Sequence, residues 1–294
     1  MKWRRIHINI GIIGAGRVGT TMGKYIIAHG GKIQGFYSRT IEHAKEAAQF
    51  CNTNYFKDLD SLTEVSDTLF ITTSDGAIKN VWDCIAAKNV KGKVICHFSG
   101  SLSSDIFSNK ESAGVVACSV HPIYAFSNKF TAYQNLTEAL FTVEGDSEAL
   151  SRMQELFAIL PNRVVLIPTE TKGKYHAAAS VASNQLTGLL WMAIELLKET
   201  GITEKTAYEM LEPLVKNSVN SIFSNGCKEA LTGPIERNDL ETVKKHLVAL
   251  ENNALWNQAY QANGKLVLEV AKEKNPKCDY QKMQQLFQED VKRK

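Results

Sequence analysis

The sequence predicts an α/β protein in which a doubly wound parallel Rossmann sheet is followed by an all-helical second domain. From Ile6 to about Pro168, short β-branched runs alternate with helical patterns, which is typical of parallel βαβ units. After Pro168 the strand patterns stop and only helical spacing follows. The 294 residues are enough for two domains, which we place at residues 1–169 and 170–294.

The predicted strands of the first domain share a high content of β-branched and aromatic residues. They cover Ile8 to Ile13, Lys32 to Tyr37, Thr68 to Thr72, Val94 to Phe98, Val115 to Val120, Ala139 to Val143 and Val164 to Ile167. Helical patterns lie between them over Gly19 to Ala28, Ile41 to Phe50 and Glu148 to Leu160. This alternation predicts a sheet with helices on both faces.

The second domain begins with a helical segment predicted from Tyr175 to Glu199. Apolar residues at helical spacing continue from Ala207 to Ile222, with Pro213 as an expected kink. Asn238, followed by a glutamate three residues later, forms a capping-box pattern. A helix should therefore run from Leu240 towards Ala271.

Composition argues against several other classes of protein. Hydrophobic residues make up 44% and charged residues 22%, with a formal net charge of +3 and interspersed signs, so neither disorder nor nucleic acid binding is expected. The six cysteines form no CxxC pair, which favours a reduced cytoplasmic protein without structural zinc. Glycines and Arg17 interrupt the apolar N-terminal stretch, so no signal peptide is expected. The most apolar helix, near Leu186 to Leu197, is shorter than the roughly 20 residues of a membrane span.

A GxGxxG pattern follows the first predicted strand and opens a helix. It reads Gly14-Ala15-Gly16-Arg17-Val18-Gly19. In this context Gly14 permits a tight turn, Gly16 lets the backbone approach a pyrophosphate, and Gly19 lets helix and strand pack closely. The helix N-terminus would offer free N–H groups to the phosphates. The pattern predicts a dinucleotide site, and a glycine-rich turn without a ligand is the alternative.

The end of the second predicted strand favours NADP(H) over NAD(H). It reads Tyr37-Ser38-Arg39-Thr40, where an NAD-specific domain usually carries an acid for the ribose 2′-hydroxyl. The guanidinium of Arg39 and the hydroxyl of Ser38 suit a 2′-phosphate. Arg39 as an ordinary solvated side chain is the alternative.

Polar residues that follow strands are the first candidates for the chemistry, because ligands of doubly wound sheets bind outside the carboxyl ends of the strands. The segments are Thr73-Ser74-Asp75, His97-Phe98-Ser99-Gly100 and Ser119-Val120-His121-Pro122. We assign Thr73 and Ser74 to the cofactor. His121 is the best general acid or base, because imidazole titrates near neutrality, and Ser99 could orient it or hold the reacting oxygen. His97 is expected inside its strand and is interpreted as structural.

Three polar residues fall four positions apart on the predicted helix after Tyr175. His176, Ser180 and Asn184 would line one face of a regular α-helix. Polar groups on an otherwise buried face need partners, which a substrate between the domains would supply. A hydrogen-bond network between helices is the alternative.

Together these motifs resemble the two-domain proteins that pair a Rossmann-like domain with a helical C-terminal domain of unknown function. Further matching segments are Tyr175-His176-Ala177-Ala178-Ala179 and Leu231-Thr232-Gly233-Pro234-Ile235 with Arg237 and Asp239. That family is similar to the 6-phosphogluconate-dehydrogenase-like superfamily, which includes ketopantoate reductases, hydroxyisobutyrate dehydrogenases and prephenate dehydrogenases.

The resemblance also implies which residues act in catalysis. Prephenate dehydrogenases carry a serine and a catalytic His-Pro at positions that Ser99 and His121-Pro122 resemble. Hydroxyacid dehydrogenases place Lys and Asn four residues apart on the first interdomain helix. Asn184 matches that Asn, but Ser180 stands in place of the Lys, so the resemblance does not extend to lysine catalysis of that type.

The expected function is an NADP-dependent oxidoreductase that transfers a hydride between NADPH and a small oxo acid or hydroxy acid. His121 would protonate the alkoxide, and Asn184 with His176 would hold the substrate. The superfamily resemblance makes ketopantoate the first candidate substrate and implies a homodimer. The charge pattern and the short apolar helix predict neither nucleic acid nor membrane partners. The alternatives are prephenate or arogenate oxidation and, in another class, an NADP(H)-binding sensor or scaffold without turnover.

Overall fold

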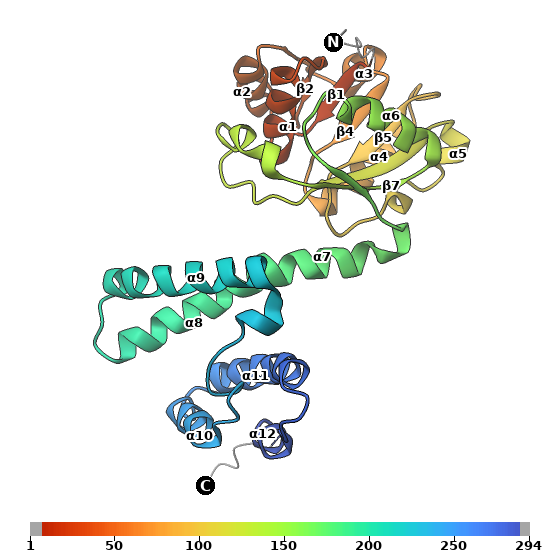
Figure 1. The fold of residues 1–294 in the computed structure, drawn as a ribbon. Helices are drawn as coiled ribbons and strands as arrows, with labels where there is room; N and C mark the ends of the chain where they lie inside the picture. The colour runs from red at the N-terminus through yellow and green to blue at the C-terminus, as the bar shows by residue number, and fades with distance from the viewer. Residues whose placement is uncertain (1–7, 289–294) are drawn as a thin grey trace. The chain divides into compact units, whose positions relative to one another are not determined.

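The structure, a computed structural model, describes residues 8–288 and consists of two compact units that divide between Ser183 and Asn184 (Figure 1). The described strands all belong to the first unit. The predicted boundary of the functional domains, between residues 169 and 170, stays a prediction. The first seven residues, for which the sequence predicts no signal peptide, lie outside the described range.

The first unit contains an eight-stranded sheet with the order β3-β2-β1-β4-β5-β6-β7-β8. The strands are β1 (Ile10–Ile13), β2 (Ile33–Tyr37), β3 (Asn54–Tyr55), β4 (Thr68–Ile71), β5 (Val94–His97), β6 (Val116–Pro122), β7 (Phe141–Gly145) and β8 (Val164–Leu166). Neighbouring strands are parallel except β6 and β7, which are antiparallel. The chain order reverses between β1 and β4, which is the switch point of a doubly wound sheet. The predicted fold class is confirmed.

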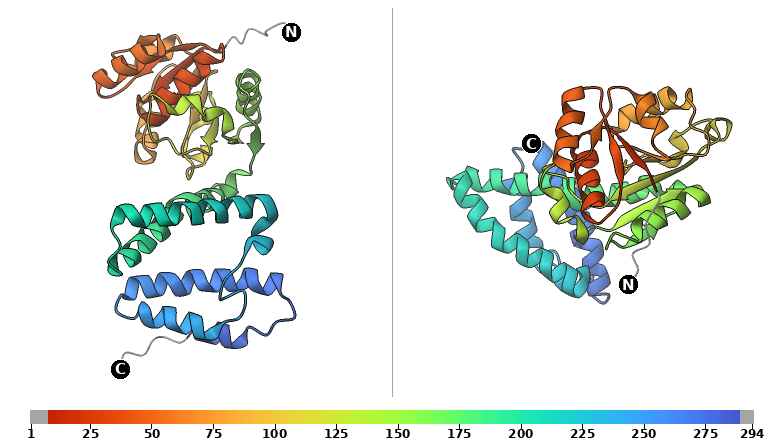
Figure 2. Two further views of the ribbon diagram at one scale, coloured as in Figure 1. Left: turned by 60° about the vertical axis from the view of Figure 1, so that its left-hand side comes forward. Right: turned by 90° about the horizontal axis from the view of Figure 1, so that it is seen from above.

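Helices cover both faces of this sheet (Figure 1 and Figure 2). On one face, α1 (Arg17–Ala28), α2 (Ile41–Cys51) and α6 (Ser147–Phe157) contribute to one apolar core. On the other face, α3 (Leu59–Glu64) and α4 (Asp75–Ala86) contribute to a second core. The central strands are buried on both faces, which explains why they are continuous apolar runs rather than alternating ones.

Shorter elements complete the first unit. They are η1 (Ser104–Ile106), α5 (Lys110–Ala113), η2 (Ala132–Gln134), η3 (Leu136–Glu138) and η4 (Thr169–Thr171). The sequence does not predict β3, because this edge strand has two residues, both exposed, and so carries no hydrophobic pattern. The other predicted strands are confirmed, with ends that differ by a few residues.

The segment predicted as one helix from Tyr175 to Glu199 is not regular. It comprises α7 (Lys172–Ser180), a π-helical turn (Val181–Gln185) and α8 (Leu186–Glu199). A π turn closes its hydrogen bonds over one residue more than an α-helix does. The segment is therefore not one regular α-helix, and the shared face of His176, Ser180 and Asn184 stays a prediction.

The second unit is built from α8, α9 (Glu204–Ala230), α10 (Leu240–Ala249), α11 (Ala254–Lys274) and α12 (Gln281–Leu286). Its main apolar core contains Val243, Leu268, Met283 and Phe287. None of the helices within residues 8–288 has the length and apolar character that crossing a membrane requires. All six cysteines are free, and a cytoplasmic location stays a prediction.

Three details of this unit differ from the sequence-based expectation. The helix α9 continues through Pro213, and its backbone leaves helical angles at Gly226 instead, where φ is 82°. The cap of α10 is Asp239, whose carboxylate accepts the N–H of Thr242 at 3.0 Å. The predicted helix from Leu240 to Ala271 is divided into α10 and α11, because Asn253 caps a new helix.

Candidate functional site

The glycine turn between β1 and α1 has the tight geometry that its sequence predicts. Gly14 has a φ of +112°, and its N–H donates to the carbonyl of Tyr37 at 2.8 Å. The hydroxyl of Thr72 donates to the carbonyl of Gly14 at 2.8 Å. A Cβ on Gly19 would lie 2.1 Å from that same carbonyl oxygen. Gly14 and Gly19 are therefore required by the fold itself.

Gly16 is different, because no atom of the described residues restricts it. A Cβ at this position would meet no atom within 4 Å, and the residue is exposed. Gly16 caps α1 without a side-chain hydrogen bond, and the first turn of α1 carries no acidic residue. The helix therefore presents free N–H groups to open space, as an anion site requires. Around it, Ala15 is buried, Val18 is half-buried and Arg17 is exposed.

The other predicted cofactor residues lie at the carboxyl ends of β2 and β4, the two strands that flank β1. Ser38 is half-buried and Arg39 is exposed, directly after β2. The hydroxyl of Thr73 is buried without a hydrogen-bond partner among residues 8–288, and Ser74 caps α4 without a side-chain hydrogen bond. A buried hydroxyl that lacks a partner is uncommon and suits a ligand contact. The residues at these three strand ends thus fit a dinucleotide.

His121 lies near the end of β6 and contacts two residues of α7. Its Nδ1 is 2.6 Å from the hydroxyl of Tyr175, and the two rings are nearly perpendicular at 82°. The ring of His176 is centred 6.0 Å from that of His121. Gly100, just after β5, leaves room for both imidazoles, because a Cβ there would lie 2.8 Å from Nε2 of His121 and 2.4 Å from Cδ2 of His176. The structure thus brings His121 and His176 together.

Ser99 does not orient His121 in this structure, which corrects one of its two expected roles. Its hydroxyl donates to the carboxylate of Asp75 at 2.7 Å. The same oxygen accepts the backbone N–H groups of Ser101 and Leu102. Tyr175 is the partner of His121 instead. Ser99 lies at the carboxyl end of β5, as expected, and joins that strand end to the start of α4.

The surroundings of His121 change the protonation state expected for it. Burial lowers its pKa to about 4, the neighbouring side chains of Lys172 and His176 act in the same direction, and Asp75 opposes them. Burial raises the pKa of Tyr175. At neutral pH the free site therefore holds a neutral imidazole, contrary to the expectation of titration near neutrality.

His97 is buried inside β5, as the sequence predicts for a structural histidine. Its Nε2 is 3.1 Å from the carbonyl of Ser103, and its Nδ1 accepts the N–H of Ser99. Burial lowers its pKa to about 4. A buried ring with both nitrogens occupied by backbone groups leaves no position for a substrate.

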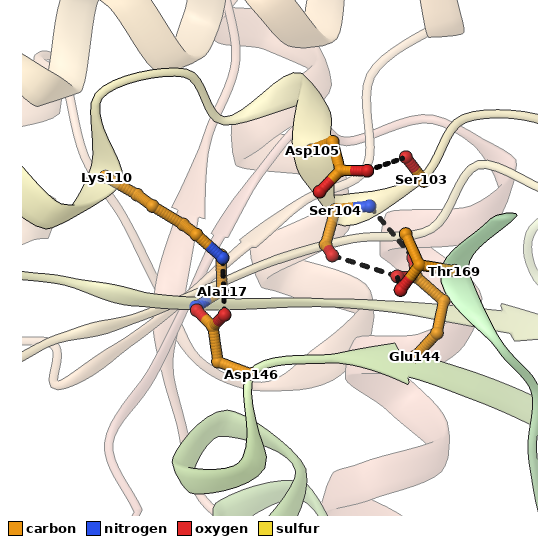
Figure 3. A network of polar contacts seen from close by, with 8 residues as sticks. All are labelled: Ser103, Ser104, Asp105, Lys110, Ala117, Glu144, Asp146 and Thr169. Atoms are coloured by element: carbon orange, nitrogen blue, oxygen red, sulfur yellow. Dashed lines mark hydrogen bonds and ion pairs between the residues drawn. The ribbon is translucent and has the colours of Figure 1, made fainter.

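Two buried ionisable groups lie beside the histidine pair, and no sequence motif reveals them. The Nζ of Lys172 donates to the hydroxyl of Ser119. The carboxylate of Glu144 accepts the N–H and hydroxyl of Ser104 and the hydroxyl of Thr169, each at 2.9 Å (Figure 3). The one usable signal is the spacing of Lys172 from the Tyr175-His176 pair, which places all three on one helix face. Asn184 belongs to the second unit, and its role at this site stays a prediction.

Two family comparisons agree with this architecture. Residues 2–122 match the Rossmann-like domain, and residues 139–267 match a domain of unknown function, DUF2520. The chain therefore pairs a Rossmann-like domain with the helical domain of that second family, and the resemblance inferred from its motifs is confirmed. A search of curated protein sequences gave no match.

Solved structures share this fold over most of both chains. A candidate NADP oxidoreductase from Bacteroides fragilis is 24% identical with a TM-score of 0.72, covering 89% of this chain and 98% of that chain. A protein from Thermotoga maritima is 24% identical with a TM-score of 0.71, covering 90% and 99%. A reductive aminase from Aspergillus terreus, in complex with NADPH and ethyl-5-oxohexanoate, is 16% identical with a TM-score of 0.62, covering 90% of each chain. At such identities the likeness establishes the fold.

Proposed function

We propose that the protein is an NADP-dependent oxidoreductase that transfers a hydride between NADPH and the carbonyl carbon of a small oxo acid. The observation that carries this proposal is the hydrogen bond between His121 and Tyr175, at 2.6 Å, at the carboxyl end of β6. That edge of a doubly wound sheet is where its ligands bind. A titratable pair at the same edge of the sheet as the dinucleotide turn is consistent with a dehydrogenase.

The residues at the strand ends support NADP(H) as the cofactor, which would supply the hydride. The open helix end at Gly16 would receive the pyrophosphate. Arg39 and Ser38 would contact the 2′-phosphate, since no carboxylate stands there to select the 2′-hydroxyl of NAD. Thr73 and Ser74 would contact the cofactor from the end of β4. The similarity to an NADP oxidoreductase and to a reductive aminase in complex with NADPH adds support.

Nε2 is the nitrogen of His121 that is left for a substrate, because Tyr175 occupies Nδ1. An anionic group of the substrate near the ring would raise the pKa of His121, opposing burial and the nearby positive charges. The imidazolium would then donate its Nε2 proton to the developing alkoxide and keep its Nδ1–H on the oxygen of Tyr175. This requirement favours an oxo acid over a neutral ketone. Ketopantoate is the first oxo acid to test, on the superfamily resemblance alone.

Two other reactions are consistent with a neutral His121. In the oxidative direction, a neutral imidazole would accept the hydroxyl proton, as a prephenate or arogenate dehydrogenase would require. Reduction of a C=N bond is the second candidate, because an iminium carbon accepts a hydride without a proton donor. The similarity to a reductive aminase favours this second candidate.

A substrate panel combined with one substitution tests the proposal. Oxidation of NADPH would be followed by absorbance with oxo acids, neutral ketones and cyclic imines. With an active substrate, His121→Asn should lower the rate about 10² to 10⁴-fold, the usual contribution of a positioned acid, and leave NADPH affinity unchanged. Parental turnover in His121→Asn would remove this residue from the mechanism. NADPH binding without any turnover would favour the sensor or scaffold.

We also propose that the protein is a homodimer through its helical unit. Large apolar side chains are exposed on α8 and α9, including Trp191 at 53%, Leu214 at 62% and Phe223 at 87%. Exposed apolar side chains gathered on neighbouring helices are typical of a protein interface. Light scattering should give twice the chain mass, and Phe223→Glu should shift it towards the monomer. A parent protein that is monomeric at micromolar concentration would contradict this.

A further inference from the structure

The interface between β6 and α7 consists of two adjacent contacts of different chemistry. On β6, Ser119 and His121 are two positions apart, so their side chains share one face of the strand. On α7, Lys172 and Tyr175 are three positions apart, so they share one face of the helix. Lys172 bonds to Ser119, and Tyr175 bonds to His121. The lysine contact therefore lies directly beside the proposed catalytic contact.

Residues of the neighbouring strand β7 lie beside both contacts. In the antiparallel register of β6 and β7, Glu144 lies opposite Ser119, and Thr142 lies opposite His121. Paired residues of neighbouring strands point to the same face of a sheet. Glu144 consequently lies on the same side of the sheet as the contact between Ser119 and Lys172, and it favours the charged form of Lys172 by Coulombic attraction.

Burial makes this arrangement costly unless the charges compensate each other. Lys172 is 2% exposed and Glu144 is also 2% exposed. Burial lowers the pKa of Lys172, and the negative charge of Glu144 opposes that shift. Glu144 also accepts the hydroxyl of Thr169, which lies in η4 just before α7 (Figure 3). Both charged residues thus tie the start of α7 to the sheet, and removing either one would leave the other buried with less compensation of its charge.

We propose that Lys172 is a positioning residue: its bond to Ser119 holds α7 so that Tyr175 reaches His121. The charge of Lys172 also disfavours a proton on His121, in addition to burial. The inference rests on the proposed role of His121 in proton transfer. Other charged or titratable groups also act at the ring. Tyr175 and His176 face it from α7, and Asp75 acts on it from the start of α4.

The groups around the His121 ring shift its pKa in both directions. Lys172 and His176 disfavour a proton on His121, and Asp75 favours it. Among these charges Lys172 has the largest effect, after burial itself. Removing the charge of Lys172 should therefore raise the pH at which His121 titrates. Glu144 does not act on His121 directly in this account, but it supports the charge of Lys172.

The test is a titration of the His121 ring by nuclear magnetic resonance in the full-length protein, with the signal assigned by its loss in His121→Asn. Lys172→Met should raise the titration midpoint. Lys174→Met is the matched control, because Lys174 lies on the same helix and carries the same charge but is exposed. In this control the titration midpoint of His121 should equal that of the parent protein. Lys172→Met removes the positive charge that compensates the buried carboxylate of Glu144, so the single variant could fail to fold. In that case the double variant Lys172→Met/Glu144→Gln, in which both positions are neutral, replaces it.

Ser119→Ala distinguishes the effect of the Lys172 charge from the effect of its hydrogen bond to Ser119. It keeps the ammonium and removes its hydrogen-bond partner, so the midpoint of His121 should move less than in Lys172→Met, while kcat falls and KM for NADPH is unchanged. The proposal is overturned if the neutral pair titrates like the Lys174→Met control, or if Ser119→Ala moves the midpoint as far as Lys172→Met does. The titration midpoints of His121 can be measured without a substrate. A failure of the proposed function would appear separately, as parental turnover in His121→Asn.

Discussion

The glycine turn offers a matched pair of substitutions that separates cofactor binding from folding. Gly16→Ala adds a methyl group that meets no atom of the described part of the chain within 4 Å, at a φ of −83° that any residue adopts. The free energy of unfolding should therefore change by no more than about 0.5 kcal/mol. The same methyl group would enter the space in front of the α1 N-terminus, where we place the pyrophosphate. NADPH binding should be lost.

Gly19→Ala should have the opposite effect. Its methyl group would lie 2.1 Å from the carbonyl oxygen of Gly14 and 2.4 Å from the hydroxyl oxygen of Thr72. A backbone carbonyl cannot rotate away as a side chain can, so α1 must shift against β1. Overpacking of this kind costs about 1–3 kcal/mol. At about 2–4 °C for each kcal/mol in a domain of this size, Tm should fall by about 2 to 12 °C.

Thermal unfolding with and without NADPH distinguishes the two variants. For a ligand at 100 times its Kd, the parent should gain about 2.7 kcal/mol of stability. Gly16→Ala should have the parental Tm without NADPH and gain nothing when it is added. If NADPH protects Gly16→Ala as well as it protects the parent, the turn is not the cofactor site. A parental Tm for Gly19→Ala would refute the packing argument.

Three further predictions follow from the same geometry. Arg39→Ala should weaken NADPH binding by about 1.5–3 kcal/mol, the value of a charge-assisted contact, and leave NADH binding nearly unchanged in calorimetry; equal losses would contradict the choice of NADP. Gly100→Ala places a Cβ 2.8 Å from Nε2 of His121 and must displace the imidazole, so turnover should fall about 10²-fold. The control Gly173→Ala, whose Cβ meets no described atom within 4 Å, should keep parental turnover. His97 and His121 have a pKa of about 4 in the folded protein against 6.5 ordinarily. Because the unfolded chain takes up these protons first, their contribution to stability is complete above pH 6.5 and is lost as the pH falls towards 4. Urea titrations that show constant stability across this window would exclude that account.

Local features of the site could be predicted from the sequence because their physics is local. A strand, a glycine turn and a helix start within about ten residues are enough to form an anion site, so Gly14, Gly16 and Gly19 were recognisable without a fold. The end of β2 likewise shows in its own residues that Arg39 stands where an acid would select NAD. The position of His121 near the carboxyl end of a strand follows from the strand pattern and the parallel connectivity.

The tertiary structure decided which groups meet and in which protonation state. Tyr175 is 54 positions away from His121 in the chain, and only the docking of α7 against β6 brings its hydroxyl to Nδ1. The same docking buries Lys172 beside Glu144, and burial moves the pKa of His121 away from neutrality. The π turn that takes Asn184 out of the α-helical register is likewise a property of the folded chain rather than of any local motif. Sequence patterns report which residues are available at strand ends and helix starts, whereas contacts and desolvation depend on segments far apart in the chain and arise only when those segments pack.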